Sequence, residues 1–239
     1  MKVALVTGGV KRLGFEFAKA LARNGYSVAL SFRSDPEAAG RAVDFLRKEE
    51  GAGTEAFQAD LAVDGAPAAL VTAVLARFGR LDALVHAASP WIPKPFSSVS
   101  LPDWEAIFRA GPRAAFFLAQ AAAPALARSS GSILFVSDVA ATQAWPTHIP
   151  HTAAKAAINA LVRNLAVAMG PNVRVNAVAP GVVLPPAEMS AEAIAALVAK
   201  TPLARQVAIA DLMAMAIAIL ENRSMTGQVV PVDAGRSIV

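Results

Sequence analysis

Short runs of apolar residues alternate along the chain with longer segments in which apolar residues recur every three or four positions. The short runs are typical of buried strands, and the longer segments are typical of amphipathic helices. Strands are predicted at residues 2–7, 27–32, 55–58, 83–86, 132–137, 174–179 and 228–232, and helices at 13–24, 36–50, 66–78, 114–128, 153–169 and 208–221. Because strands and helices alternate throughout, we expect a parallel sheet with helices on both faces.

This order predicts an α/β fold class, a Rossmann-like doubly wound parallel sheet of about seven strands. The 239 residues, 55% of them hydrophobic, are enough for a large core. Since no linker-like tract and no block of charge divides the chain, a single domain is predicted over residues 1–239. Ligands of such sheets bind at the carboxyl ends of the strands.

Composition and charge narrow the choice of partner. The longest apolar stretch, residues 209–220, carries Asp211 and is too short to span a bilayer, so no membrane partner is expected. The net charge of +4 is dispersed rather than gathered in a basic stripe, which argues against nucleic acid. With no cysteine and no secretory signal at the start of the sequence, a cytoplasmic protein that acts on a small molecule is expected.

A glycine-rich turn joins the first predicted strand to the first predicted helix and reads TGGVKRLG at positions 7–14. Glycine lets the backbone approach a phosphate closely, and the free N–H groups at the start of a helix can bind the anion. The second strand is followed by Arg33 and Ser34, with no carboxylate before Asp35, and Arg12 projects from the turn. Arginine in these places accommodates the 2′-phosphate of NADP(H), unless Arg33 is simply a solvated loop residue.

Landmarks along the full length resemble those of the short-chain dehydrogenase/reductase family. They are the glycine turn, Asp60-Leu61, Ala87-Ala88-Ser89, Lys155 in an Ala-rich helix, Pro180-Gly181, and Thr226-Gly227-Gln228 with Val232-Asp233. Within the family, the KRLG end of the turn, the segment 88–95 and Asp138, where most members have Ser, are similar to pteridine reductases. The resemblance implies an NADP(H)-dependent oxidoreductase that assembles as a homotetramer.

The resemblance also implies a set of binding residues in the loops after the strands. The expected cofactor-binding residues are Thr7, Gly8, Lys11, Arg12, Leu13, Gly14, Arg33, Ser34, Asp60, Leu61, Ala87, Ala88, Ser89, Lys155, Pro180, Gly181 and Val183. Asp60 would contact the adenine, or else cap the next helix. The expected substrate-binding residues are Ser89, Trp91, Asp138 and His151, with Trp91 stacking on a flat heterocycle or packing under its loop. Trp145 and residues 183–189 are expected to form a rim and a mobile lid.

The catalytic positions depart from the family pattern. The family's Tyr lies four residues before the Lys, but here that residue is His151, and the only tyrosine, Tyr26, lies far from the site. His86 and Gly111 stand where the family has Asn. The expected catalytic residues are Asp138, His151 and Lys155.

Either histidinium at position 151 or a protonated Asp138 could donate the proton. Lys155 would lower the pKa of His151 and Asp138 would raise it. Alternatively, Asp138 only caps its loop and His151 fills the space of the missing Tyr. No metal is expected, because Lys155 beside the histidines disfavours a cation.

The sequence leaves three alternative functions. The protein is a pteridine-reductase-like reductase of a planar carbonyl or imine compound, a weakened or inactive NADP(H)-binding sensor or interaction module, or a purely structural subunit.

Overall fold

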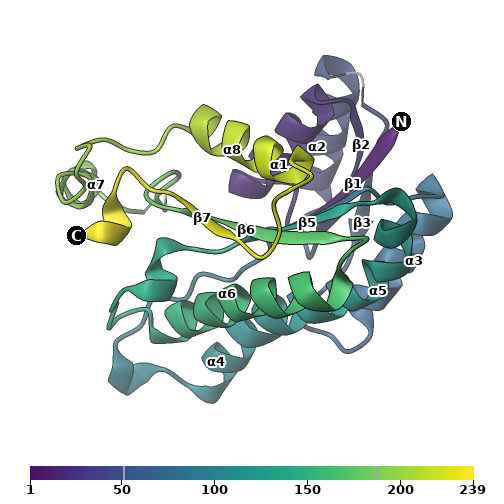
Figure 1. Ribbon diagram of the computed structural model, residues 1–239. Helices are drawn as coiled ribbons and strands as arrows, with labels where there is room; N and C mark the ends of the chain where they lie inside the picture. The colour runs from purple at the N-terminus through teal and green to yellow at the C-terminus, as the bar shows by residue number, and fades with distance from the viewer. Residues whose placement is uncertain (51, 187) are drawn as a thin grey trace.

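Seven parallel strands form one sheet in the computed structural model, which describes residues 1–50, 52–186 and 188–239 (Figure 1). The strands lie in the order β3-β2-β1-β4-β5-β6-β7, so the chain runs outward from β1 in both directions. Their bounds are β1 (Lys2–Thr7), β2 (Tyr26–Phe32), β3 (Thr54–Gln58), β4 (Ala83–His86), β5 (Ser132–Val136), β6 (Arg174–Pro180) and β7 (Val229–Val232). The predicted fold class is confirmed, because this order has the reversal between β1 and β4 of a doubly wound sheet.

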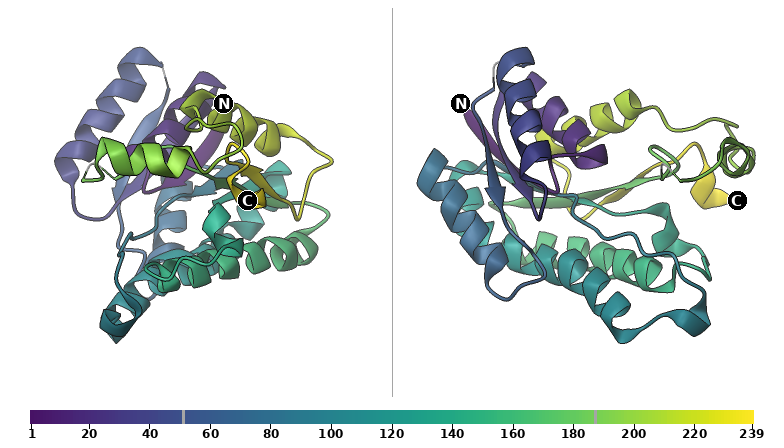
Figure 2. Two further views of the ribbon diagram at one scale, coloured as in Figure 1. Left: turned by 90° about the vertical axis from the view of Figure 1, so that its left-hand side faces the viewer. Right: turned by 180° about the vertical axis from the view of Figure 1, so that it is seen from behind.

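Helices cover both faces of the sheet, as the views from three sides agree (Figures 1 and 2). One layer contains α1 (Arg12–Arg23), α2 (Pro36–Glu49) and α8 (Ile209–Glu221), and the other contains α3 (Ala66–Phe78), α4 (Leu101–Phe108), α5 (Ala114–Ser129) and α6 (Ile149–Met169). The helix α7 (Ala191–Val198) lies at the end of the sheet together with the last residues of the chain (Figure 1).

Each face of the sheet has its own hydrophobic core. On one face Phe17 and Leu21 of α1 pack with Leu212 of α8, and on the other Leu118 of α5 packs with Ile158 of α6. The central strands are buried on both faces, which explains why they appear in the sequence as continuous apolar runs. The apolar strands therefore place the sheet at the centre of the molecule, and the loops after the strands can form a binding site.

All seven predicted strands are present within one or two residues of their predicted ends, but two helices escaped the sequence analysis. Helix α4 begins with a reciprocal capping box between Ser100 and Asp103, a recognisable signal that the short apolar pattern of this helix obscured. Helix α7 begins at the cap residue Ser190 and buries none of its residues, so it lacks a strong apolar stripe. Neither omission changes the topology.

A wide helical turn, η2 (Arg109–Arg113), joins α4 to α5 and bends the chain at Gly111. Gly111 has non-helical backbone angles (φ −91°, ψ −109°), and Pro112 has no N–H to donate to the preceding turn. The bend turns the carbonyl of Gly111 toward the sheet, where it meets His86. Within the described residues, none of the helices has both the length and the hydropathy needed to cross a bilayer.

Candidate functional site

The loops that follow the strands surround a cavity of about 800 Å³ at the carboxyl edge of the sheet. The walls come from the glycine turn, from the loop after β4, from the loop between β5 and α6, from the start of α6 and from residues 180–189 apart from residue 187. Because parallel strands end at the same edge, residues distant in the sequence meet here. The cavity therefore lies where the sequence predicted a ligand.

The glycine turn is held against the end of β4. The hydroxyl of Thr7 accepts from the backbone N–H groups of Ala87 and Ala88 at 3.2 and 3.3 Å and donates to Nδ1 of His86 at 2.8 Å. A Cβ on Gly14 would lie 2.1 Å from the carbonyl oxygen of Gly8, so only glycine fits. The first residues of α1 receive no side-chain cap, which leaves N–H groups free for an anion.

The cations expected around the extra phosphate have different partners in the structure. Arg33 and Ser34 are exposed at the end of β2, and Lys11 pairs with Asp35 beside them at 3.3 Å. Arg12, by contrast, has a left-handed backbone (φ +51°) and donates from Nη2 to the carbonyl of Leu184 at 2.7 Å. Leu184 lies in the loop after β6, so in this structure the guanidinium of Arg12 is bonded to that loop, and its place at the 2′-phosphate stays a prediction.

The remaining expected cofactor positions also lie at strand ends. Asp60 is exposed after β3 and accepts from the N–H of Ala62 within the loop, so it does not cap α3, whose N-cap is Gly65, while Leu61 beside it is buried. Gly181 packs against Asp233, since a Cβ at 181 would approach the Cα of Asp233 to 2.8 Å. Ser89, Pro180, Gly181 and Val183 line the cavity, as does Leu13.

His151 and Asp138 form a hydrogen bond on the floor of the cavity, with Nε2 and Oδ2 3.1 Å apart. Asp138 follows β5 and uses Oδ1 to cap the next turn at the N–H of Ala140, so its second oxygen is free for His151. An ionised carboxylate can only accept, so Nε2 of His151 carries the proton between the two atoms. Nδ1 is buried and has no partner among the described residues.

Lys155 lies one helical turn after His151 on the same face of α6. Its ammonium is buried and donates to the carbonyl of Val136 at 2.7 Å. Burial lowers the pKa of Lys155 from its ordinary value, and the negative charge of Asp138 acts in the opposite direction. The site thus holds an amine, an imidazole and a carboxylate together in a dry corner of the cavity.

Aromatic rings line the wall above this group. The ring of Trp91, which is 42% exposed, lies 4.7 Å from the ring of His151 and 4.6 Å from that of His148. Trp145 contacts His148 edge-on at 5.8 Å. Burial, followed by the nearby His151, lowers the pKa of His148, which favours its neutral form. Trp91 therefore faces the cavity, where a flat ligand can stack on it.

Residues 183–186, 188 and 189 line the cavity, as expected for a rim, and so does Trp145. Ala187 falls outside the described residues. The proposed mobility of this stretch stays a prediction.

The two positions at which the family has Asn contact each other. His86 donates from Nε2 to the carbonyl of Gly111 at 3.2 Å and accepts from Thr7 at Nδ1. Burial, with the nearby charge of Lys155, lowers the pKa of His86 to about 4. His86 is consequently a neutral structural group that connects the glycine turn to the bend between α4 and α5.

Protonation of His86 is expected to weaken the fold in acid. Because the pKa of His86 is about 4 when folded and near 6.5 when unfolded, the unfolded chain takes up the proton first as the pH falls. The stabilising contribution is present above pH 6.5 and is lost toward pH 4, which amounts to about 2 kcal/mol between pH 7 and pH 5. Urea unfolding of the wild type and of His86→Asn at both pH values measures this. An equal loss in both proteins would refute it.

Sequence reasoning placed His148 in the cleft beside His151, which the structure confirms, but among the other residues that line the cavity it missed Leu197 and Arg236. His148 is close to His151 in the sequence, and Arg236 follows the last strand, so position after a strand was the signal available for Arg236. Leu197 belongs to α7 and gave no signal.

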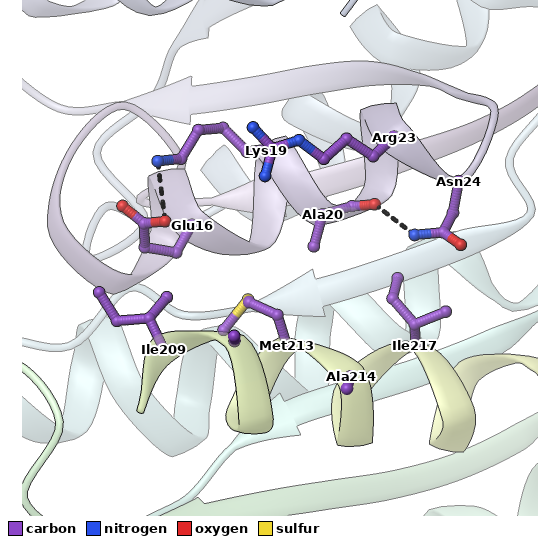
Figure 3. A pocket seen from close by; sticks show the side chains of 10 residues that line it. Glu16, Lys19, Ala20, Arg23, Asn24, Ile209, Met213, Ala214 and Ile217 are labelled. Atoms are coloured by element: carbon purple, nitrogen blue, oxygen red, sulfur yellow. Dashed lines mark hydrogen bonds and ion pairs between the residues drawn. The ribbon is translucent and has the colours of Figure 1, made fainter. Parts of the chain in front are cut away.

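A second hollow, of about 440 Å³, lies between α1 and α8 (Figure 3). Ile209, Met213 and Ile217 of α8 face a row of polar residues on α1. Both cations of this row are neutralised, Lys19 by Glu16 at 2.8 Å and Arg23 by Glu50 at 2.8 Å. The hollow is a packing groove between two helices, and the expected catalytic residues Asp138, His151 and Lys155 all line the larger cavity. Among the described residues, no cluster suited to a metal ion occurs.

Comparison with known proteins agrees with the geometry. Residues 9–237 match a family model described as enoyl-(acyl carrier protein) reductase. An oxidoreductase of uncharacterised activity from Methylorubrum extorquens is 33% identical over 98% of this chain and 97% of its own length. A hydroxynaphthalene reductase-like protein from Metarhizium guizhouense is 36% identical over 75% of this chain and 67% of its own length.

A solved structure of similar fold is FolM, alternative dihydrofolate reductase 1 from Brucella canis, complexed with NADP. The two chains superpose with a TM-score of 0.90 at 28% identity, over 100% of this chain and 95% of the other.

Proposed function

The chain belongs to the short-chain dehydrogenase/reductase family, and from this premise we propose that it is an NADPH-dependent reductase of a planar carbonyl or imine compound, similar to a pteridine reductase. The observation that carries the proposal is the pair of His151 and Asp138 beside Lys155 on the floor of a cavity walled by Trp91. The similarity to an alternative dihydrofolate reductase supports the substrate class.

The glycine turn between β1 and α1 and the residues that follow β2 are suited to binding NADPH. The uncapped start of α1 and the close approach of Gly8 and Gly14 leave room only for backbone, which suits a diphosphate. Exposed Arg33 and Ser34 after β2 would hold the 2′-phosphate, with Lys11 nearby. When bound there, NADPH supplies the hydride.

The protein's own part is to provide the proton and orient the substrate. Nε2 of His151 and Oδ2 of Asp138 share a proton at the cavity floor. When the pair carries one further proton, as an imidazolium beside the carboxylate, it gives the Nε2 proton to a carbonyl oxygen or imine nitrogen placed beside these two atoms and is left as neutral imidazole and carboxylate. Such a general-acid step contributes about 10²–10⁴-fold in rate. The ammonium of Lys155 adds positive charge in a dry environment, and Trp91 holds a flat ring in place by stacking.

We also propose that the protein is a cytoplasmic homotetramer. The support for assembly is family membership together with the exposed apolar side chains of Phe117 on α5 and Val167 on α6, the latter 85% exposed. The absence of cysteine from the sequence is compatible with a reducing compartment.

The proposal is tested by following the absorbance of NADPH during incubation with dihydrobiopterin and with a panel of planar ketones from pH 5 to 8. We expect oxidation of NADPH, with kcat/KM at least ~10-fold lower for NADH, because Arg33 has no 2′-phosphate to bind in NADH. Calorimetry run in parallel separates binding from turnover. Tight binding without turnover at any pH would favour a nucleotide-binding protein without redox activity, and no binding of either nucleotide would remove the proposal.

A further inference from the structure

The cavity wall that follows β7 carries an arginine that no described residue neutralises. Arg236 lines the cavity, and in the part of the chain that the structure describes its guanidinium forms no ion pair and donates no hydrogen bond. We propose that Arg236 binds an anionic group of the substrate, so that the substrate is a planar carbonyl or imine compound bearing a carboxylate. This inference rests on the proposed reductase function and specifies its substrate class.

The backbone around Arg236 is fixed by neighbouring polar groups. The carboxylate of Asp233, which is buried at the end of β7, accepts from the N–H groups of Gly235 at 2.9 Å and Ser237 at 2.7 Å. Gly235 adopts a left-handed conformation (φ +84°), which sharply turns the chain just before the arginine. The amide of Gln143 donates to the carbonyl of Arg236 at 2.7 Å. Because the backbone here is already ordered, only the side chain of Arg236 has to be immobilised when it binds an anion.

The same glutamine connects Arg236 to the aromatic wall. Oε1 of Gln143 accepts from the indole N–H of Trp145 at 3.2 Å, and Trp145 packs on His148, which packs on Trp91. A row of rings therefore runs from the backbone of Arg236, by way of Gln143, to Trp91, whose ring touches that of His151. A flat molecule that lies along this row would have one end at the proton donor and the other end at Arg236.

Arg236 lies too far along the sheet to serve the cofactor's extra phosphate. The 2′-phosphate position follows β2, whereas Arg236 follows β7, and the strand order places these strands five spacings apart, roughly 24 Å. Arg33 and Lys11 already occupy the β2 side. The arginine is thus available to the substrate.

None of the other charged groups that line the cavity, among the described residues, neutralises Arg236 or takes its place as an anion-binding group. Asp138 is paired with His151, Lys155 donates to the backbone, and Arg12 donates to the carbonyl of Leu184. Glu188 at the mouth is exposed and forms no ion pair with Arg236 among the described residues. A substrate carboxylate would give Arg236 the bidentate partner that its planar donors match.

The experiment compares two substrates that differ in charge and by one methyl group, dihydropterin-6-carboxylate and its methyl ester. Values of kcat/KM with NADPH are measured for the wild type, for Arg236→Gln and for Arg223→Gln, an exposed arginine outside the cavity that serves as the matched control. We expect Arg236→Gln to lower kcat/KM for the carboxylate about 10–100-fold and to leave the ester within about twofold. Arg223→Gln should change neither, and the melting temperatures should show that all three proteins fold.

An equal fall for both substrates, or no fall for either, would overturn the proposal. If the wild type turns over neither compound, the reductase function fails separately, and the role of Arg236 is then decided by calorimetry. In that arm, the oxidised pterin-6-carboxylate and its ester are titrated into NADP-loaded wild type and Arg236→Gln. Weaker binding of the carboxylate alone in the variant supports the anion site, and identical affinities in the two proteins refute it.

Discussion

Replacement of Asp138 by Asn is expected to reduce kcat for NADPH oxidation by about 10²–10⁴-fold, the usual contribution of a general acid. Asn keeps the size of Asp and can still accept from Ala140 through Oδ1, so the turn after β5 should stay intact. What is lost is the carboxylate oxygen that lies 3.1 Å from Nε2 of His151 and holds the shared proton there. Initial rates at saturating NADPH and substrate measure the effect.

The matched control is Asp211→Asn, an exposed aspartate in the first turn of α8 that does not line the cavity. Its kcat should stay within about twofold of wild type, a change smaller than that of any lost catalytic group. The affinity for NADPH, from calorimetry, should be similar in both variants, because neither residue is placed at the nucleotide. If Asp138→Asn turns over as fast as Asp211→Asn, then the pair is not the source of the proton.

Substitution of Gly14 by Ala should abolish tight NADPH binding and destabilise the protein. The added Cβ would lie 2.1 Å from the carbonyl oxygen of Gly8 and 2.8 Å from its carbonyl carbon, so the turn must open. Forced expansion of a packed site costs about 1–3 kcal/mol, and the displaced N–H groups at the start of α1 no longer converge on one anion. We expect Kd for NADPH to rise by at least ~10-fold, with a lower free energy of unfolding in urea.

The same change at Gly40 is the internal comparison. Gly40 lies within α2. Apart from the adjacent backbone of that helix, no atom lies within 4 Å of a Cβ added at this position. Alanine there should raise the free energy of unfolding by about 0.5–1 kcal/mol, since it restricts the unfolded chain and suits a helix. The free energy of unfolding should therefore fall for Gly14→Ala and rise for Gly40→Ala. A neutral Gly14→Ala with unchanged Kd would contradict the role given to the turn.

The sheet was predictable from the sequence because its central strands are buried on both faces. Apart from the exposed Lys2 at the start of β1, strands β1 and β5 contain only apolar or small residues, a pattern that solvent-exposed elements do not imitate. Elements at the periphery carried weaker information. Helix α7 buries no residue, and the bend at Gly111 depends on a backbone conformation that residue type alone does not specify.

For the site, the sequence placed residues at strand ends but could not give the directions of their side chains. The facing of His151 and Asp138 was anticipated, and the structure brings these residues to 3.1 Å. The direction of the Arg12 side chain was not anticipated. The residue has a left-handed backbone, and its side chain donates to the carbonyl of Leu184 rather than lying beside Arg33. Arg236 also escaped notice, since its position depends on the turn capped by Asp233 and on the amide of Gln143, 93 residues away.

The distribution of tryptophan gives the protein a natural optical reporter. Of three tryptophans in the chain, Trp91 and Trp145 line the cavity, whereas Trp104 stacks on Phe108 at 4.6 Å and is not among the residues of its wall. Fluorescence from the first two indoles responds to whatever fills the cavity, and the third supplies a constant background signal. Ligand titrations can therefore be read from unlabelled, unmodified protein, even for compounds that are never turned over.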